Sequence, residues 1–351
     1  MNKGNKEYFY SLNGLRGLSI TSVLLGHISS KNWIFNDLEK IFFLRPFIGV
    51  IQDSQMGVNL FFIISGFLIT SIIISEEKIT GKINHKNFFF KRIIRIFPVY
   101  FALLFVYLIF HLLGIIFIPK ESWITAITYT KYFNWKVDWY TAHGWSLSIE
   151  EHFYLVWPLI FYFFKNFRRK IIFFIIIMVP FIRYFSHKYH ITGINNLTIL
   201  YRIDAIAFGC LIAFYKNYLI KKINTIYFII SLFIIVFFEE FLSLLKVLNL
   251  NNLMLSEGHR HGLVINICLS MVLIYSVFGP KKIMFKILNS KVLSFVGAIS
   301  YSIYIWQQPF LSDNNYWINN LPQSIILVFL ISILSYYLIE KPFLRLKKFV
   351  K

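Results

Sequence analysis

Long runs of apolar residues alternate with short polar segments along the whole chain of 351 residues. A run of about 20 apolar residues is long enough to cross a bilayer as a helix. Windows of this length predict ten membrane-spanning helices, at 11–30, 57–75, 96–118, 149–164, 171–187, 199–215, 223–240, 262–279, 292–309 and 321–339. The predicted fold class is therefore all-α integral membrane, with one domain over residues 1–351.

The positions of Lys and Arg predict the orientation of these helices. If the N-terminus is cytoplasmic, six segments that face the cytoplasm together hold 25 of the 36 Lys and Arg residues. These segments are 1–16, 76–95, 165–170, 216–222, 280–291 and 340–351. Because cytoplasmic loops carry the excess of positive charge, both termini are predicted to be cytoplasmic. The chain is therefore predicted to cross a membrane several times.

Composition argues against the soluble classes. Charged residues make up 15% of the chain, whereas soluble domains carry about 25%. A net charge of +20 would suggest nucleic-acid binding in a soluble protein. Here the cations lie between apolar runs, so no nucleic-acid partner is expected. Cys210 and Cys268 both lie in apolar runs and support neither a disulfide framework nor a metal site.

The first predicted helix carries two ionisable residues, Arg16 and His27. Eleven positions are about three helical turns, so both side chains are predicted on one face, about 16 Å apart along the axis. Ionisable residues inside membranes are usually functional. The alternative is that Arg16 is an ordinary interfacial cation and His27 caps the far end of the helix.

A second pair of cations, Arg92 and Arg95, lies at the start of the third predicted helix. Residues three apart share a helical face, and two guanidinium groups there can bind phosphates bidentately. Ordinary positive-inside charge is the alternative interpretation. Pro98, three residues further on, is predicted to start or kink this helix.

The segment before and inside the fourth predicted helix is rich in polar and aromatic residues. Glu150 and Glu151 are adjacent, and they are flanked by His143, Trp145, Ser146, Ser148 and His152. Paired carboxylates beside imidazoles and an indole suit acid–base chemistry on a hydroxyl-bearing substrate. An aromatic interfacial belt with acids at a helix N-terminus would also fit this composition.

Other notable residues have structural interpretations. Gly57, Ser65 and Gly66 are small enough to let helices approach closely in lipid. Arg202 and Asp204 are two positions apart and do not share a helical face, so each is expected to have a partner on another helix.

Two further features lie near the end of the chain. Tyr301 and Tyr304 are helix neighbours whose hydroxyls need hydrogen-bond partners in lipid. Glu340, followed by Lys341 and Pro342, is predicted to end the tenth helix at the cytoplasmic surface.

Seven segments, taken in order, resemble the acyltransferase-3 family of membrane acyltransferases that O-acylate sugars. They are LNGLRGLSITSVLLGH, GVNLFFIISGFLIT, KRIIRIFPVYF, GWSLSIEEHFYLVWP, YRIDAIAFGCLIA, GAISYSIYIWQQP and YYLIEKPFLR. The resemblance covers nearly the whole chain. It places the family's Arg-x10-His pair on Arg16 and His27, and its Arg-x-x-Arg pair on Arg92 and Arg95. The family's Trp-Ser-Leu-x-x-Glu-Glu segment falls on 145–151.

The sequence departs from the family pattern at three positions. Asn13 and Asn59 stand where the family often has Asp, so a role for an acid there is absent or compatible with an amide. Gln307 stands where the family often has His, which argues against a general base at this position. The extra C-terminal esterase-like domain of some members is also missing from this sequence, so a stand-alone acetylase is expected.

The resemblance implies transfer of an acyl group, most commonly acetyl, from cytoplasmic acetyl-CoA to a hydroxyl of a surface or lipid-linked glycan such as lipopolysaccharide O-antigen. Acetyl-CoA would be a co-substrate, with no permanently bound cofactor and no metal. Together with the spacing of the residues, the resemblance assigns the candidate site residues to three roles. They are His27, Glu150 and Glu151 for catalysis; Arg16, Arg92 and Arg95 for acyl-CoA; and His143, Trp145, Ser146 and Tyr301 for the acceptor.

Two other classes of function remain open at this point. A transporter or flippase for a lipid-linked sugar would also have about ten helices and buried charge. It would move its substrate without consuming acyl-CoA. In a scaffold subunit the polar motifs would only hold helices together, and changes at Arg16 or His27 would lower abundance rather than activity.

Overall fold

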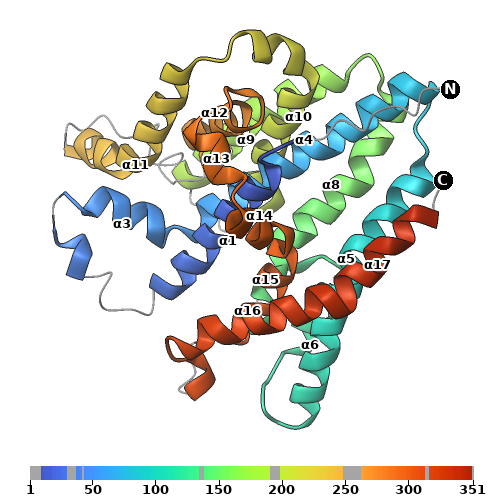
Figure 1. Cartoon of the computed structure of the whole chain (residues 1–351), viewed down its shortest axis with the longest axis vertical. Helices are drawn as coiled ribbons and strands as arrows, with labels where there is room; N and C mark the ends of the chain where they lie inside the picture. Colours follow the sequence, from blue (N-terminus) through green and yellow to red (C-terminus); the bar gives the residue numbers. More distant parts are fainter. Residues whose placement is uncertain are drawn as a thin grey trace. The chain divides into compact units, whose positions relative to one another are not determined.

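The computed structural model describes residues 9–29, 37–41, 43–133, 138–189, 198–247, 262–312 and 316–349 (Figure 1). All regular structure within these ranges is helical. The chain divides into two compact units. The first unit comprises Met1–Lys82 and Ile160–Ala298, and the second comprises Ile83–Leu159 and Ile299–Lys351.

Within the described residues, five helical stretches are long and apolar enough to cross a membrane. They are α4 (Ser54–Thr80), α5 (His85–Leu112), Leu200–Lys221 of α10 (Thr198–Lys221), Thr225–Leu245 of α11 (Thr225–Val247), and Gln323–Leu346 near the C-terminus. These stretches support a multi-pass, all-helical membrane protein. The count of ten spans and the cytoplasmic termini remain predictions.

Several other predicted spans are also helices. They are α1 (Leu12–Ser29), α8 (Gly144–Phe163), α9 (Arg168–Lys188) and α12 (Leu263–Phe278). The remaining short helices are α3 (Arg45–Gln52), α6 (Lys120–Ile127), η1 (Lys131–Phe133), α7 (Trp139–Ala142), α13 (Ile283–Leu288), η3 (Trp317–Asn319) and η5 (Lys347–Phe349).

Helix α5 begins eleven residues before the predicted start at 96, and Pro98 lies inside it. Pro98 therefore does not start the helix, and the alternative prediction that it kinks the helix stays a prediction. The start is instead set by Asn84, whose side chain accepts a hydrogen bond from the backbone N–H of Asn87 at 3.1 Å. A side-chain cap of this kind satisfies an N–H that has no partner within the helix.

The last two predicted spans also differ from the structure. The span predicted at 292–309 is two helices, α14 (Lys291–Ala298) and α15 (Ser300–Trp306), because Ile299 leaves the helical conformation with ψ of 6°. The tenth span does not end at Glu340. Helix α16 (Gln323–Ser335) continues through one π-helical turn, η4 (Tyr336–Glu340), into α17 (Lys341–Leu346).

Glu340 has a different role from the predicted helix terminator. Its carboxyl is buried and accepts a hydrogen bond from Ser302 Oγ at 2.8 Å. Pro342 is the second residue of α17 and does not interrupt this run of helix.

Helix α4 is the centre of the first unit, where it packs against α1, α10 and α12. A Cβ atom at Gly57 would lie 2.5 Å from the backbone oxygen of Ser19 on α1. One at Gly66 would overlap the backbone oxygen of Ile206 on α10. This confirms that these two glycines serve close helix packing, as their size predicts.

A network of five buried polar side chains links four helices of the first unit. Its members, which we call the polar network, are Asn59, Arg183, Arg202, Asp204 and Asn266. Arg183 donates a hydrogen bond to Asp204 Oδ2 at 2.8 Å, and Asn266 donates to the same oxygen at 3.1 Å. Arg202 donates to Asn59 Oδ1 at 3.0 Å and also to Gln55. The expectation that Arg202 and Asp204 have partners on other helices is therefore confirmed.

Asn59 uses both ends of its amide in this network. Its oxygen accepts from Arg202, and its nitrogen donates to Asn266 Oδ1 at 2.9 Å. A carboxylate at position 59 would accept from Arg202 but would have no hydrogen to donate to Asn266. This explains how an amide fits where the family often has an acid.

The Arg183–Asp204 pair offers a test of this packing. We expect Asp204→Asn to lower the free energy of unfolding by about 3–5 kcal/mol, because it leaves a buried guanidinium without its carboxylate. The double variant Arg183→Gln/Asp204→Asn should lose less than the sum of the two single variants. Thermal or denaturant unfolding of the four proteins in detergent measures this coupling, and strictly additive losses would contradict it.

Candidate functional site

Arg16 and His27 both lie on α1, and both side chains are partly exposed. The start of this helix is anchored by Asn289. The backbone N–H of Ser11 donates to Asn289 Oδ1 at 3.1 Å, and the Asn289 amide donates to Ser11 Oγ at 2.8 Å. The helix is continuous between Arg16 and His27, so the predicted spacing of about 16 Å along its axis follows from helix geometry.

Arg92 and Arg95 lie on α5, two to three turns after its first residue, and both are partly exposed. The Arg92 guanidinium lies 5.3 Å from the ring centroid of Tyr154 on α8 and 5.6 Å from that of Phe88. Contacts of this kind between a cation and an aromatic face are attractive. Arg92 is thus held in place by aromatic rings rather than extended into the surrounding medium.

Glu150 and Glu151 lie in the first half of α8, in the same unit as the arginine pair. Tyr154 donates a hydrogen bond to Glu150 Oε2 at 3.1 Å. Among the described residues, Glu151 Oε1 is buried without a hydrogen-bond partner. Both carboxylates attract Arg92 electrostatically. The structure therefore brings Arg92 together with the two glutamates, although they lie far apart in the sequence and on different helices.

His143 and Ser146 meet Tyr304 in the second unit. The Tyr304 hydroxyl donates to the backbone oxygen of His143 at 3.0 Å and lies 2.5 Å from Ser146 Oγ. The rings of His143 and Tyr304 pack edge to face, with centroids 5.8 Å apart. Trp145, which lies between His143 and Ser146 in the sequence, is partly exposed. Tyr304 thus fixes two candidate acceptor residues, and its need for a hydrogen-bond partner is met as predicted.

Tyr301, a further candidate acceptor residue, also uses its hydroxyl in a contact within the protein. It donates to the backbone oxygen of Ile96 on α5 at 2.6 Å, which ties α15 to α5. This confirms that the hydroxyl has a partner. An acceptor contact by Tyr301 stays a prediction.

Gln307 is a further candidate for the functional site. In the sequence it stood out only because it replaces a histidine that the family often has at this position. It is completely buried, and both polar atoms of its amide lack a hydrogen-bond partner among the described residues. A buried amide without partners is costly, so such a group is a natural contact for a bound polar molecule. The sequence feature that could have identified this residue is a polar glutamine at the end of an apolar helix.

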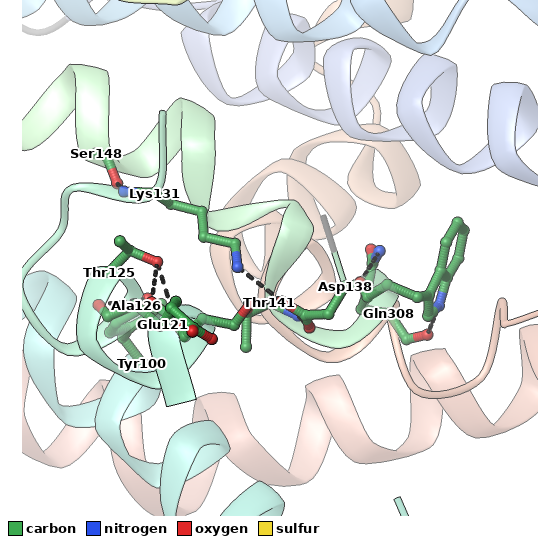
Figure 2. Close-up of polar contacts among 11 residues, drawn as sticks. Tyr100, Glu121, Thr125, Ala126, Lys131, Asp138, Thr141, Ser148 and Gln308 are labelled. Atoms are coloured by element: carbon green, nitrogen blue, oxygen red, sulfur yellow. Dashed lines mark hydrogen bonds and ion pairs between the residues drawn. The ribbon is translucent and has the colours of Figure 1, made fainter. Parts of the chain in front are cut away.

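A buried ion pair holds the segment that leads into α8 (Figure 2). Lys131 Nζ lies 2.7 Å from Asp138 Oδ2, and the two side chains are 3% and 7% exposed. Asp138 also accepts from the backbone N–H and the hydroxyl of Thr141 at 2.8 and 2.6 Å. The backbone N–H of Lys131 donates to Ser148 Oγ on α8 at 3.3 Å. The pair therefore connects η1 to the first turns of the helix that carries Glu150.

The surroundings of this ion pair shift both of its pKa values. Burial acts to raise the pKa of Asp138, but hydrogen bonds from Lys131 and Thr141 outweigh it and hold that pKa below its ordinary value of 3.8. Burial lowers the pKa of Lys131, against the hydrogen bond to Asp138. Residues 131 and 138 were not singled out by the sequence, because nothing in their spacing marks them as a pair.

A family model described as an acyltransferase domain matches residues 9–340, nearly the whole chain. The chain belongs to the acyltransferase-3 family. All ten candidate site residues, from Arg16 to Tyr301, lie inside the matched range. The resemblance drawn from the seven sequence segments is thereby confirmed.

Relatives of this acyltransferase-3 chain are named O-acetyltransferases. OatA of Staphylococcus aureus strain NCTC 8325 / PS 47 is 29% identical over 367 residues, and the alignment covers 96% of this chain and 57% of OatA. OatA of strain COL gives the same identity and coverage. The chain therefore spans a little over half the length of the curated relatives it matches. No solved structure matches it.

The Lys131–Asp138 pair predicts an acid-sensitive stability. Because the pKa of Asp138 is lower in the folded state, its contribution is fully present above its ordinary pKa near 3.8 and is lost as pH falls through the lowered value. We expect Asp138→Asn to cost about 3 kcal/mol at neutral pH, since Lys131 is then buried without a carboxylate. When the pH is lowered below the ordinary pKa of Asp138, the stability of the variant should decrease less than that of the wild type.

The exposed pair Lys40–Asp37, with side chains 76% and 53% exposed, provides a matched control. Asp37→Asn should leave the unfolding midpoint nearly unchanged, because exposed ion pairs contribute little. Thermal unfolding across a pH series compares the three proteins. Equal decreases of the unfolding midpoint for Asp138→Asn and Asp37→Asn would show that burial does not increase the contribution of the Lys131–Asp138 pair to stability.

Proposed function

We propose that this chain is a membrane O-acetyltransferase that moves an acetyl group from acetyl-CoA to a hydroxyl of a cell-surface or lipid-linked glycan, such as lipopolysaccharide O-antigen. The observation that carries the proposal is the acyltransferase family match over residues 9–340. The name of the relative OatA supports acetyl as the acyl group and a hydroxyl as its acceptor. In a bacterium the site of action would be the inner membrane.

Three arginines are proposed to bind the donor. Arg92 and Arg95 share one face of α5 and present two guanidinium groups, which match the geometry of phosphate oxygens. Arg16 is assigned the same role near the start of α1. The contacts of Arg92 with Tyr154 and Phe88 support this role, because a guanidinium held by rings loses little further freedom on binding.

His27 is proposed as the general base. In the transfer step, the oxygen of the sugar hydroxyl attacks the carbonyl carbon of the thioester while His27 takes the hydroxyl proton. The new C–O ester bond forms and the C–S bond breaks. The proton then passes from His27 to the departing thiolate, so the products are the acetylated glycan and free coenzyme A. His27 carrying the acetyl group transiently is the alternative form of this role.

The second unit supplies the proposed remaining roles. Glu150 and Glu151 are assigned to orienting the base or the acceptor hydroxyl. The Glu151 oxygen without a hydrogen-bond partner among the described residues supports this, since a hydroxyl could donate to it. His143, Trp145, Ser146 and Tyr301 are assigned to the acceptor, with the indole as a surface on which a sugar ring can stack.

Replacing His27 tests the chemistry. We expect His27→Ala to lower O-acetylation of the host glycan by about 10²–10⁴-fold at unchanged protein abundance, because the general base is lost. Mass spectrometry of the glycan from a deletion strain, complemented with each variant, measures the acetyl substituents.

His111→Ala is a suitable control, because His111 packs against Phe117 and Trp123 and has no assigned role in the reaction. It should restore acetylation as the wild type does. Full acetylation with His27→Ala would disprove the proposed base. An unchanged substituent pattern on a truncated or absent glycan in the deletion strain would favour a transporter instead.

The arginine pair gives a separate kinetic test. We expect Arg92→Gln to raise the KM for acetyl-CoA about tenfold or more, with a smaller effect on kcat, because phosphate contacts are made equally in the ground state and the transition state. Lys91→Gln is the control, since it removes the same charge from the neighbouring position. Equal effects of the two changes on KM would show that only the net charge of this helix start matters.

A further inference from the structure

A polar cavity of about 560 Å³ lies in the first unit, at the C-terminal end of α4. Its walls come from α4, from the junction of α8 with α9, and from the second half of α10. Helix α10 packs against both α4 and α9 (Figure 1). The volume is in the range of small-molecule sites. No step of the proposed acetyl transfer uses this cavity.

The cavity is strongly basic. Five of its thirteen lining residues are cations, and only one is an acid. The cations are Lys78, Lys165, Arg168, Arg169 and Lys216. Such an excess of positive charge around one concave site attracts an anion.

The single acid is already engaged by one of these cations. Arg168 binds both carboxylate oxygens of Glu77, at 2.6 and 2.9 Å, and also donates to the backbone oxygen of Phe161. Lys165 lies further from Glu77, at 3.8 Å. The charges of Arg168 and Glu77 therefore offset each other. The other four cations give the lining of the cavity its excess of positive charge.

A neutral hydrogen-bond donor also lines this cavity. Ser71 lines it, and its hydroxyl is buried without a hydrogen-bond partner among the described residues. Ser71 precedes Lys78 by seven residues, which is about 10 Å along α4. A hydroxyl group in this position can donate to an oxygen of a bound anion.

The cavity lies at the ends of membrane-spanning helices, on the side that the Lys and Arg distribution predicts to be cytoplasmic. Ile74 and Phe214 contribute apolar surface between its cations. A ligand that fits this combination has a negatively charged head and an apolar body. Basic pockets between helices at this level of a membrane bind the phosphate groups of anionic lipids.

We propose that this cavity binds the phosphate ester of an anionic phospholipid, with the phosphate between Lys78, Arg169 and Lys216 and within reach of the Ser71 hydroxyl. The lipid would hold the C-terminal end of α4 against α9 and α10. This inference does not depend on the catalytic assignment of any residue.

Selective lipid retention tests the proposal. The chain is placed in nanodiscs of mixed phosphatidylglycerol and phosphatidylcholine, released, and examined by native mass spectrometry for bound lipid. We expect the wild type to retain phosphatidylglycerol in preference to phosphatidylcholine. The double variant Lys78→Gln/Arg169→Gln should lower the apparent affinity for phosphatidylglycerol about tenfold or more, because each cation contributes separately to phosphate binding.

Lys221→Gln/Lys222→Gln is the matched control. It removes two exposed cations just beyond the cavity and should leave retention unchanged. Ser71→Ala, which changes no charge, should weaken retention without altering the elution profile of the protein. Equal retention by the double variant and the control would overturn the proposal. Displacement of the lipid by coenzyme A or by inorganic phosphate would overturn it too. Such a result would assign the cavity to a soluble phosphate-bearing ligand.

Discussion

A charged side chain inside a membrane protein must have a partner, because hydrocarbon offers neither water nor counter-ions. This constraint organises the described parts of the chain. In the first unit, Arg183 is neutralised by Asp204, and Arg168 by Glu77. The polar network ties four helices together through one carboxylate, two guanidinium groups and two amides. Helix packing and charge pairing therefore cannot be separated in this unit.

The same constraint shapes the candidate site in the second unit. Arg92 lies against the ring of Tyr154, and Tyr154 in turn donates to Glu150. Groups that lie far apart in the sequence, on two different helices, thus act on one another. Buried polar groups with no hydrogen-bond partner among the described residues, such as the amide of Gln307, are then the most informative positions, because a bound ligand can supply the missing hydrogen bonds.

Much of the fold could be predicted from the sequence, since apolar length and small residues act locally. Gly57 and Gly66 pack as predicted, and Arg202 and Asp204 have partners on other helices. Those partners could not be named, because Arg183 is recognisable only after α9 and α10 are packed. Helix ends were predicted less well. The helix continues past Glu340 instead of ending there, and the carboxyl of Glu340 is buried and accepts a hydrogen bond from the distant Ser302. Local pattern contains no information on such distant contacts.

The sequence motifs identified the candidate residues, whereas only the structure shows which side chains lie next to them. The motif segment around Glu150 and Glu151 gave no indication that Tyr154 and Arg92 would lie beside them. Nor did it indicate that a buried Lys131–Asp138 pair would anchor the chain just before α8. Both are contacts between segments that no short motif includes.

The proposed reaction of this chain is the transfer of an acetyl group from acetyl-CoA to a glycan. The most direct measurement uses the purified protein in nanodiscs, acetyl-CoA labelled in its acetyl group, and glycan from the organism that carries the chain. We expect label in ester linkage on the glycan and release of one coenzyme A for each acetyl group transferred. Movement of the glycan across a bilayer with no coenzyme A released and no label transferred would contradict it.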